Sequence, residues 1–401
     1  MTKPELLAPA GNLEKLKTAF LFGADAVYVG NPVFGLRKYA ENFNDDELRE
    51  GIAFANKRNK QVYVVLNAFA QEKDISAITN YLKTLNQLRP HALIISDIGV
   101  LELAKQHTNI PLHISTQASI ANAEACQFYQ DLGAKRIILA REVSLKECET
   151  IQETFQGELE LFVHGAMCAS YSGRCVISNY TSGRDSNRGG CIQSCRHNYK
   201  VSSQTNDISP YNTTLMNAKD LWGIRQLEQL MTLNIASLKI EGRMKSPMYL
   251  ANVVSCYRKA IDEISQNGTL QNPSHYETQL AHVSNRQFSD QSLGNTLNKE
   301  SINTQFNGYQ HGQKFIGTVQ EKHPNNSLII QVKEPFSSQD TLHLHSHSHG
   351  HITIQSPNIQ TLSNITLEKA NPNQLIKLNW QPSFSHSHIH DILYKKTPST
   401  H

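Results

Sequence analysis

The segment ELLAPAGNLEKLKTAFLFGADAVYVG, from Glu5 to Gly30, contains two short apolar runs separated by a stretch with helical spacing. The runs ELLAPAG, from Glu5, and AVYVG, from Ala26, have the length of strands that are buried on both faces of a parallel sheet. Between them, Asn12 can cap the start of a helix and Gly23 can end it. This unit therefore predicts a strand, a helix and a second, parallel strand.

The same pattern recurs through roughly the first 250 residues. Six more apolar runs begin at Gln61, Ala92, Pro111, Arg136, Glu158 and Ser237. Alternating strands and helices form either an open doubly wound sheet or a closed (β/α)8 barrel, and a count of eight favours the barrel. A final helix is predicted after Ser246, its cap, with Pro247 at its first position. We therefore expect an α/β protein with a TIM-like barrel over residues 1–265.

The composition and the hydrophobic pattern of the sequence change after this helix. Residues 266–312 are polar and predict a linker or helical extension. Short strand-like runs then begin at Phe315, Ser327, Thr341, His351, Gln374 and Asp391. They predict a small all-β C-terminal domain over residues 313–401, similar to a barrel.

Histidines are concentrated in this C-terminal part. HLHSHSHGH alternates from His343 to His351, and HSHIH spans His386 to His390. Alternation places side chains along one face of a strand. The two runs could bind a divalent metal if they pair, or they could form a solvated edge that is protonated at mildly acidic pH.

The overall composition and charge exclude few classes of protein. A net charge of +3 is too small to argue for or against nucleic acid. The start of the chain does not resemble a signal peptide, and no apolar run is long enough to span a membrane. We therefore expect a cytoplasmic protein without membrane contact. In that reducing compartment, clustered cysteines are more often metal ligands or catalysts than disulfides.

Polar residues end most of the predicted barrel strands, where barrel enzymes hold their catalytic groups. His164 and Glu241 are the candidate catalytic residues. The candidate substrate-binding residues are Asn67, Gln117, Arg141, Lys239 and Arg243. For any single one, the alternative is that a polar residue simply marks the change from strand to loop.

The run LKIEGR carries the most charge among these strand ends. Lys239 and Glu241 share one face by the two-residue period of a strand, and Arg243 joins them if the strand continues. Charged residues at the end of a buried strand need partners. The group predicts either an anion-binding site or a buried Lys–Glu–Arg network that holds the barrel mouth together.

Four of the seven cysteines follow the seventh predicted strand. They have the spacing C-x6-C-x15-C-x3-C and are Cys168, Cys175, Cys191 and Cys195. Four thiolates suit a structural zinc or an iron–sulfur cluster, and unconnected thiols are the remaining alternative. Only Cys191 and Cys195 have the close pairing typical of zinc sites, so the wide spacing favours [4Fe–4S]. The other cysteines, in predicted helices, are Cys126, Cys148 and Cys256 and are expected in the core.

The cysteine-rich stretch, residues 166–200, is also basic and carries interleaved tyrosines. Cations and aromatic rings together can hold a phosphate backbone and stack a base, although a solvated loop shows the same bias. The candidate nucleic-acid-binding residues are Tyr171, Arg174, Arg184, Arg188 and Arg196.

The stretch ELELFVHGAMCASYSGRCVIS, from Glu158, resembles the signature of the collagenase-like peptidases, family 32 of the unclassified peptidases. The residues that occupy this pattern are Glu160, Phe162, Gly165, Ala166, Met167 and Cys168. PELLAPAG, GADAVYVG, LIISD, MNAKDL and SLKIEGRMKS are also similar to that family, so the resemblance covers the barrel almost from end to end. The single β module, VHGAMCASYSGRC and GGCIQSCR most resemble the members that take part in 5-hydroxylation of the wobble uridine of tRNA.

This resemblance implies cofactors and partners. The four clustered cysteines would be ligands of a [4Fe–4S] cluster. Prephenate would replace molecular oxygen as the source of the hydroxyl, and its two carboxylates, or those of a related small dianion, would occupy Arg141, Lys239 and Arg243. The anticodon stem-loop of tRNA would be held by the C-terminal domain and the basic stretch, and a redox or homologous partner subunit could assist.

Two other functions stay open at this point. One is the peptidase activity of the family name, although the chain carries neither H-E-x-x-H nor G-x-S-x-G. The other is a tRNA- or RNA-binding accessory protein without chemistry of its own.

Overall fold

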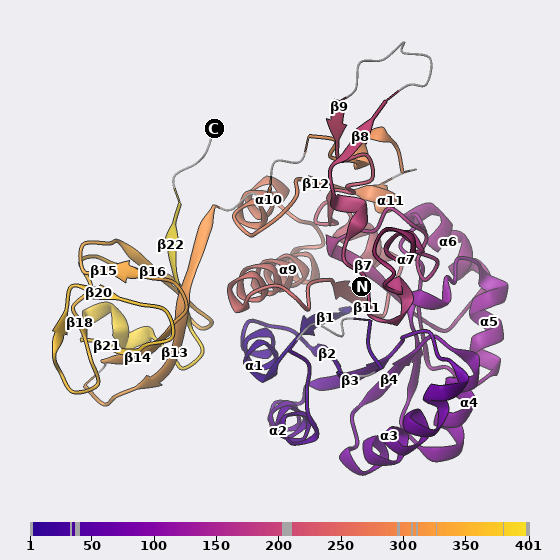
Figure 1. Ribbon diagram of the computed structural model, residues 1–401, viewed down its shortest axis with the longest axis horizontal. Coiled ribbons are helices and arrows are strands. Elements are labelled where there is room, and N and C mark those ends of the chain that lie inside the picture. Colours follow the sequence, from indigo (N-terminus) through magenta and orange to yellow (C-terminus); the bar gives the residue numbers. More distant parts are fainter. Residues whose placement is uncertain are drawn as a thin grey trace.

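The computed structural model describes residues 3–32, 34–36, 41–202, 211–294, 297–305, 308–309, 312–325, 327–379 and 381–397. Within these ranges, eight parallel strands form a closed barrel in the order β11-β1-β2-β3-β4-β5-β6-β7, and pairing of β7 with β11 closes it (Figure 1). Their bounds are β1 Glu5–Ala10, β2 Ala26–Gly30, β3 Gln61–Leu66, β4 Ala92–Ile95, β5 Leu112–Ile114, β6 Arg136–Ile138, β7 Glu158–Ala166 and β11 Ser237–Ile240. The predicted (β/α)8 barrel is confirmed, and each of the eight runs is a strand.

Helices alternate with these strands and cover the outside of the barrel (Figure 1). They are α1 Leu13–Leu21, α2 Asp45–Asn56, α3 Ile75–Leu88, α4 Ile98–His107, α5 Ala123–Asp131, α6 Leu145–Thr154, α8 Leu227–Thr232 and α9 Pro247–Asn267. The predicted caps are confirmed. The Asn12 side chain accepts a hydrogen bond from the Lys15 amide at 2.9 Å, and that of Ser246 accepts one from the Tyr249 amide at 3.2 Å.

An insertion separates β7 from α8. It contains α7 Ile177–Ser182, β8 Tyr199–Val201, β9 Tyr211–Thr213, β10 Asp220–Trp222 and the 3-10 turns η3 Ser186–Arg188 and η4 Ser194–Arg196. The last residues of β7, His164 to Ala166, pair antiparallel with β10. The chain therefore leaves the barrel along β7 and returns beside it. The cysteine-rich segment between these strands consequently lies at the carboxyl ends of the barrel strands.

The segment after α9 packs back on this insertion. It holds α10 Pro273–Ala281, β12 Phe288–Ser289, α11 Gln291–Gly294 and η5 Lys299–Ser301. β12 pairs with β10, and Asp220 forms a buried ion pair with Arg286. The predicted domain boundaries, 1–265, 266–312 and 313–401, stay a prediction.

The C-terminal part contains an antiparallel sheet in the order β17-β16-β22-β13-β14-β21-β18-β19. The bounds are β13 Gln313–Lys322, β14 Leu328–Val332, β16 Leu342–Ser346, β17 Gly350–Ile354, β18 Ile359–Gln360, β19 Thr366–Leu367, β21 Leu375–Leu378 and β22 Ile392–Lys396. β15 Phe336–Ser337 pairs with β20 Lys369–Ala370. The predicted all-β part is confirmed, and it has a hydrophobic core of its own.

This sheet contacts the barrel at α1 and α9. The Thr318 hydroxyl donates to Glu14 Oε1 at 2.6 Å, and Asn252 Nδ2 donates to Gln313 Oε1 at 2.9 Å. The buried side chains of Ile392 and Tyr394 belong to the hydrophobic cluster of the barrel. Apolar and polar contacts together thus dock the two parts.

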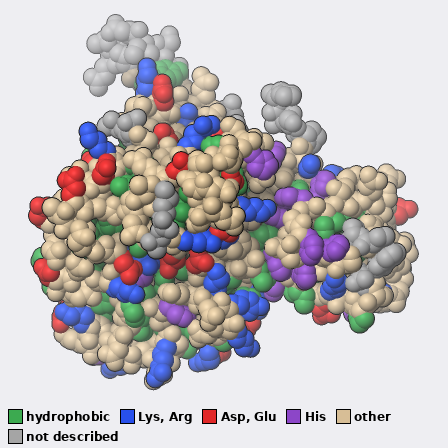
Figure 2. All heavy atoms as spheres, turned by 180° about the vertical axis from the view of Figure 1, so that it is seen from behind, with side chains coloured by type: hydrophobic (Ala, Val, Ile, Leu, Met, Phe, Trp, Pro, Cys, Tyr) green, Lys and Arg blue, Asp and Glu red, His purple; other side chains and the backbone are tan. Residues whose placement is uncertain are grey.

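The histidine runs lie partly in this junction, and Figure 2 shows many histidine side chains gathered on and beside the C-terminal sheet. The His345 ring is 4% exposed, 4.8 Å from the Phe22 ring and 4.2 Å from that of His351. The predicted solvated edge is wrong for His345, because the strand turns this position toward α1. His349 and His386 are exposed as predicted.

Over the described ranges, no three His, Cys, Asp or Glu side chains are grouped where they could hold a metal ion, so metal binding by the histidine runs stays a prediction. Within those same ranges, every helix is too short or too polar to cross a membrane.

Candidate active site at the barrel mouth

A cavity of about 120 Å³ lies at the carboxyl ends of the barrel strands. Residues that follow the strands and residues of the insertion line it together. The polar and cysteine side chains among them include Tyr28, Asn67, Ser115, Gln117, Arg141, Cys168, Cys175, Cys191, Cys195, Arg196, Lys239, Glu241 and Arg243. The volume exceeds what one buried water needs. The cavity occupies the end of the barrel where enzymes of this fold hold their catalytic groups.

All four clustered cysteines line this one cavity. Cys168 is exposed, and the other three are half-buried. Arg141 Nη1 donates a hydrogen bond to Cys168 Sγ at 3.3 Å. Burial raises the pKa of the Cys195 thiol above its usual value, and the Arg196 guanidinium opposes that shift. The four thiols therefore share one cavity, but among the described residues no three of them are grouped closely enough to hold a metal ion, so the iron–sulfur cluster stays a prediction.

Lys239, Glu241 and Arg243 all reach the cavity, as their two-residue spacing predicts. Lys239 Nζ lies 2.9 Å from Glu160 Oε1 and 4.6 Å from the centre of the Tyr28 ring. The Arg243 side chain lies against the backbone of Gly30, where an added Cβ would meet Arg243 Nη1 at 1.8 Å. The missing side chain of Gly30 therefore makes room for this guanidinium.

Arg141 and Glu241 face each other at the cavity. Arg141 Nη2 lies 3.6 Å from Glu241 Oε2, and its guanidinium stacks 4.4 Å from the centre of the Phe162 ring. The Tyr28 hydroxyl lies 3.1 Å from the same carboxylate oxygen. Burial, with the Glu241 charge adding to it, raises the pKa of Tyr28 well above its usual value. Tyr28 is therefore a neutral donor that holds Glu241 in place.

The charge of the cavity wall is positive. Among the described lining residues, the charged side chains are the cations Arg141, Arg196, Lys239 and Arg243 and the carboxylate Glu241. Positive walls in a low-dielectric cleft attract anions. The wall therefore suits a small molecule with more than one negative charge.

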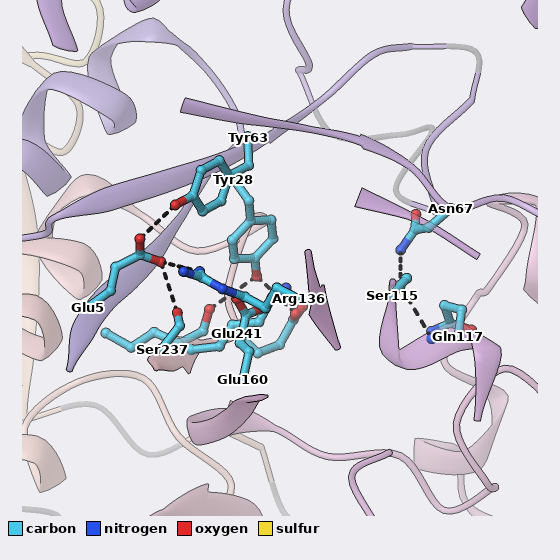
Figure 3. A network of polar contacts seen from close by, with 12 residues as sticks. Glu5, Tyr28, Tyr63, Asn67, Ser115, Gln117, Arg136, Glu160, Ser237 and Glu241 are labelled. Atoms are coloured by element: carbon cyan, nitrogen blue, oxygen red, sulfur yellow. Dashed lines mark hydrogen bonds and ion pairs between the residues drawn. The ribbon is translucent and has the colours of Figure 1, made fainter. Parts of the chain in front are cut away.

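A buried ion network lies beneath the cavity (Figure 3). Glu160, which is 0% exposed, lies between Lys239 and Arg136, and Arg136 Nη1 contacts it at 3.4 Å. Arg136 also pairs with Glu5 at 2.7 Å, and the Tyr63 hydroxyl donates to Glu5 at 2.6 Å. The buried-network alternative for LKIEGR is therefore confirmed for Lys239, which also lines the cavity, and the anion-binding alternative stays a prediction. The sequence carried one sign of this network. Glu5, Arg136 and Glu160 are charged residues within apolar strand-like runs, and buried charges require partners.

Asn67 and Gln117 meet at Ser115 on the opposite wall (Figure 3). Asn67 Nδ2 donates to Ser115 Oγ at 3.1 Å, and the Gln117 amide donates to the same oxygen at 3.3 Å. Asn67 Oδ1 is buried and accepts no hydrogen bond from the described residues. This oxygen is available to a donor on a bound substrate.

His164 lies outside the cavity. His164 was predicted from its position at the end of a strand, but the pairing of β7 with β11 shifts register between Lys239 and Ile240, and the His164 side chain does not line the cavity. Its ring is 1% exposed and 5.4 Å from the rings of Tyr257 and Phe288. Burial lowers the pKa of His164 to about 3, so the ring is neutral. Its position gives no support to a catalytic role.

The candidate nucleic-acid-binding residues differ in their surroundings. Tyr171 is 71% exposed, Arg174 is exposed, Arg184 is half-buried and Arg196 lines the cavity. The Arg188 guanidinium instead forms two contacts with Asp74, at 2.6 and 3.2 Å. Arg188 is thus engaged within the protein.

Residues 11–303, a range that includes every cavity-lining side chain named above, match the family model for peptidase family U32. The chain belongs to peptidase family U32. This U32 chain is 46% identical over 267 residues to tRNA hydroxylation protein P1 of Bacillus subtilis (strain 168), across 65% of this chain and 63% of that protein. It is 34% identical over 398 residues to tRNA hydroxylation protein P of Escherichia coli (strain K12), across 86% of each. It is 32% identical over 302 residues to the collagenase of Porphyromonas gingivalis, across 71% and 72%.

Proposed function

We propose that this U32 protein takes part in 5-hydroxylation of the wobble uridine of tRNA at the barrel-mouth cavity. The observation that carries the proposal is the convergence of four thiols and four cations on one cavity. Two relatives named tRNA hydroxylation proteins support the class of reaction and of substrate.

The reaction requires an oxygen donor that is also an oxidant. Replacing C5–H of uridine by C5–OH removes two electrons from the base. If the donor is an organic hydroxyl, base–H and donor–OH become base–OH and donor–H, and one molecule supplies the oxygen and accepts the electrons. Prephenate, a hydroxylated dianion, would meet both needs, and we expect Arg141, Lys239 and Arg243, which line the cavity, to bind its carboxylates.

Cys168, Cys175, Cys191 and Cys195 would hold the [4Fe–4S] cluster. When bound, such a cluster supplies one-electron transfer beside the cavity. We expect protein purified without oxygen to be brown and to carry about four irons per chain. A colourless protein with stoichiometric zinc would contradict the cluster.

The RNA would approach from the exposed side of the insertion. Tyr171 and Arg174 lie on that side, and their ring and guanidinium suit a base and a phosphate. The wobble base must leave its stack to reach a cavity this enclosed. The anticodon loop, whose bases are unpaired, makes that step least costly.

Nucleoside mass spectrometry of tRNA tests the proposal. The host strain lacks this gene and all other routes to 5-hydroxyuridine. It is complemented with the wild-type gene, with Cys175→Ser, or with the control Cys148→Ala. Cys148 is a suitable control because it is buried in α6. The wild type and Cys148→Ala should restore 5-hydroxyuridine, Cys175→Ser should not, and a block in prephenate synthesis should abolish it. No 5-hydroxyuridine with the wild type refutes the proposal, and restoration by Cys175→Ser refutes the need for the cluster.

Peptidase activity is the second candidate, because one relative is named a collagenase. Incubation of the purified protein with collagen and gelatin tests it. Cleavage, together with unchanged tRNA nucleosides in the strain that lacks the gene, would replace the proposed function.

A further inference from the structure

A second hollow, which we call the side groove, opens next to the cavity. Its volume is about 390 Å³, and Asn67, Gln117 and Gly173 line both spaces. Its other walls come from the ends of β3 and β4, the turn after β5 and the insertion. The side chains that characterise it are Phe69, Asp97, Ser119, Tyr129 and Arg174.

Phe69 presents an exposed ring on a fixed backbone. The side chain is 59% exposed. The Phe69 amide donates to the carbonyl of Asn187 at 2.8 Å, and its carbonyl accepts from Arg188 Nη1 at 2.6 Å. Arg188 is itself held by Asp74. A single exposed aromatic residue is ordinary on a protein surface, but one whose backbone is bound on both sides beside a groove is preorganised for stacking.

A cation stands in the same groove. The Arg174 side chain is exposed, and its Nε donates to Ser119 Oγ at 3.3 Å. Aromatic rings that stack bases and arginines that pair with phosphates are the two elements of single-strand recognition. Asp97 adds an acceptor, since its Oδ1 caps α4 and the other carboxylate oxygen carries no hydrogen bond among those of the described residues.

We propose that the side groove binds the nucleobase next to the modified one, stacked on Phe69, with its phosphate near Arg174. The proposal rests on the proposed function, because the neighbouring cavity must hold the modified base. The shared wall of Asn67, Gln117 and Gly173 places two successive nucleotides in adjoining spaces. Enzymes that extrude a base read its neighbours in this way. Arg188 is then a positioning residue for Phe69 and does not contact the RNA.

Fluorescence anisotropy tests the side-groove proposal. The whole cluster-loaded protein is titrated, at several salt concentrations, into a fluorescein-labelled RNA hairpin that carries an anticodon loop with a wobble uridine. Phe69→Ala should weaken binding about 5- to 150-fold, and Phe69→Tyr should retain the affinity. Tyr211→Ala is the matched control, because Tyr211 is 49% exposed on β9, outside the groove. Arg174→Ala should reduce the slope of log affinity against log salt concentration by about one, because one phosphate contact is lost. Arg188→Gln should weaken binding without changing this slope.

The possible results distinguish failure of the side-groove proposal from failure of the proposed function. If the wild type binds the hairpin and Phe69→Ala binds as well as Tyr211→Ala, the side-groove proposal is overturned and the proposed function is untouched. If the wild type does not bind the hairpin, both are overturned. Phe69→Trp keeps an aromatic ring at this position, so it tests the groove without removing the side chain. If the hairpin stacks on this ring, the tryptophan emission should change when the hairpin is added. If Phe69→Trp binds the hairpin but its emission stays constant, the side-groove proposal is also overturned.

Discussion

At the scale of single residues, Gly30 and Arg243 show how a missing side chain shapes the cavity. The Arg243 guanidinium occupies the space of a Cβ at Gly30, and the Arg243 side chain is 5% exposed. The obstructing atoms, Arg243 Nη1 and Asn42 Oδ1 at 2.9 Å, are side-chain tips and not backbone, so the backbone can tolerate a methyl group. The guanidinium would have to move, however, and the anion site would lose its geometry.

We therefore predict that Gly30→Ala leaves the melting temperature nearly unchanged but weakens prephenate binding about 10- to 100-fold, the loss expected for one charge-assisted hydrogen bond. Isothermal titration calorimetry measures this. Gly35→Ala is the control, because its Cβ would meet the same Arg243 Nη1 at an ordinary 3.6 Å. Equal prephenate affinity in the wild type and both variants would remove Arg243 from the anion site.

The sequence predicted some of these residues and missed others for a common physical reason. Lys239, Glu241 and Arg243 were predictable because two-residue parity holds along β11 and beyond it. His164 was predicted from its position at the end of a strand, but it lies past the register shift and outside the cavity. The pairing of Arg188 with Asp74 joins residues 114 positions apart, and only the folded chain brings them together.

At the scale of elements, β7 has two roles along its length. Its first half supplies Glu160 to the buried network, and its second half leaves the barrel to pair with β10. A buried charge that loses its partner costs about 3–5 kcal/mol, whereas an exposed pair contributes about 0–1 kcal/mol. The network should therefore be sensitive at Glu160 and tolerant at the rim.

We predict that Glu160→Gln lowers the free energy of unfolding by about 3 kcal/mol or more, because Lys239 keeps its charge in a buried site without its carboxylate. Glu158→Gln should cost about 1 kcal/mol or less, because Glu158 is 34% exposed at the rim of the network. Urea unfolding of both variants measures the difference. Similar costs at the two positions would show that the network is not the main stabilising feature of β7.

At the scale of the whole molecule, the apolar runs predicted both parts of the chain but not how they dock. Strand and helix periods are local, whereas the junction of α1, α9 and the C-terminal sheet is formed by side chains far apart in sequence. His345 illustrates this, since alternation predicts only that it shares a face with His343 and His347. Its burial against Phe22 comes from the docking.

This burial makes the stability of the junction depend on pH. Burial, followed by the charges of His351 and Lys259, lowers the pKa of His345 to about 2. Because this pKa lies below the usual 6.5, the unfolded chain binds the extra proton as the pH falls. The contribution of His345 is therefore complete above about pH 6.5 and is lost as the pH falls toward the folded value. Asp391 has the opposite shift, since burial raises its pKa to about 6, and it offsets part of this loss.

We predict that His345→Phe reduces the loss of stability between pH 6 and 4 by up to about 1.4 kcal/mol per pH unit, the effect of one proton. Phenylalanine has a similar shape, and His345 Nδ1 makes no hydrogen bond among the described residues, so the packing on Phe22 should persist. Urea midpoints at pH 7, 6, 5 and 4 give the slopes, with His349→Phe as the exposed control. If the slope of His345→Phe equals that of the control, the ring is protonated in the folded protein and the docked junction admits the charge.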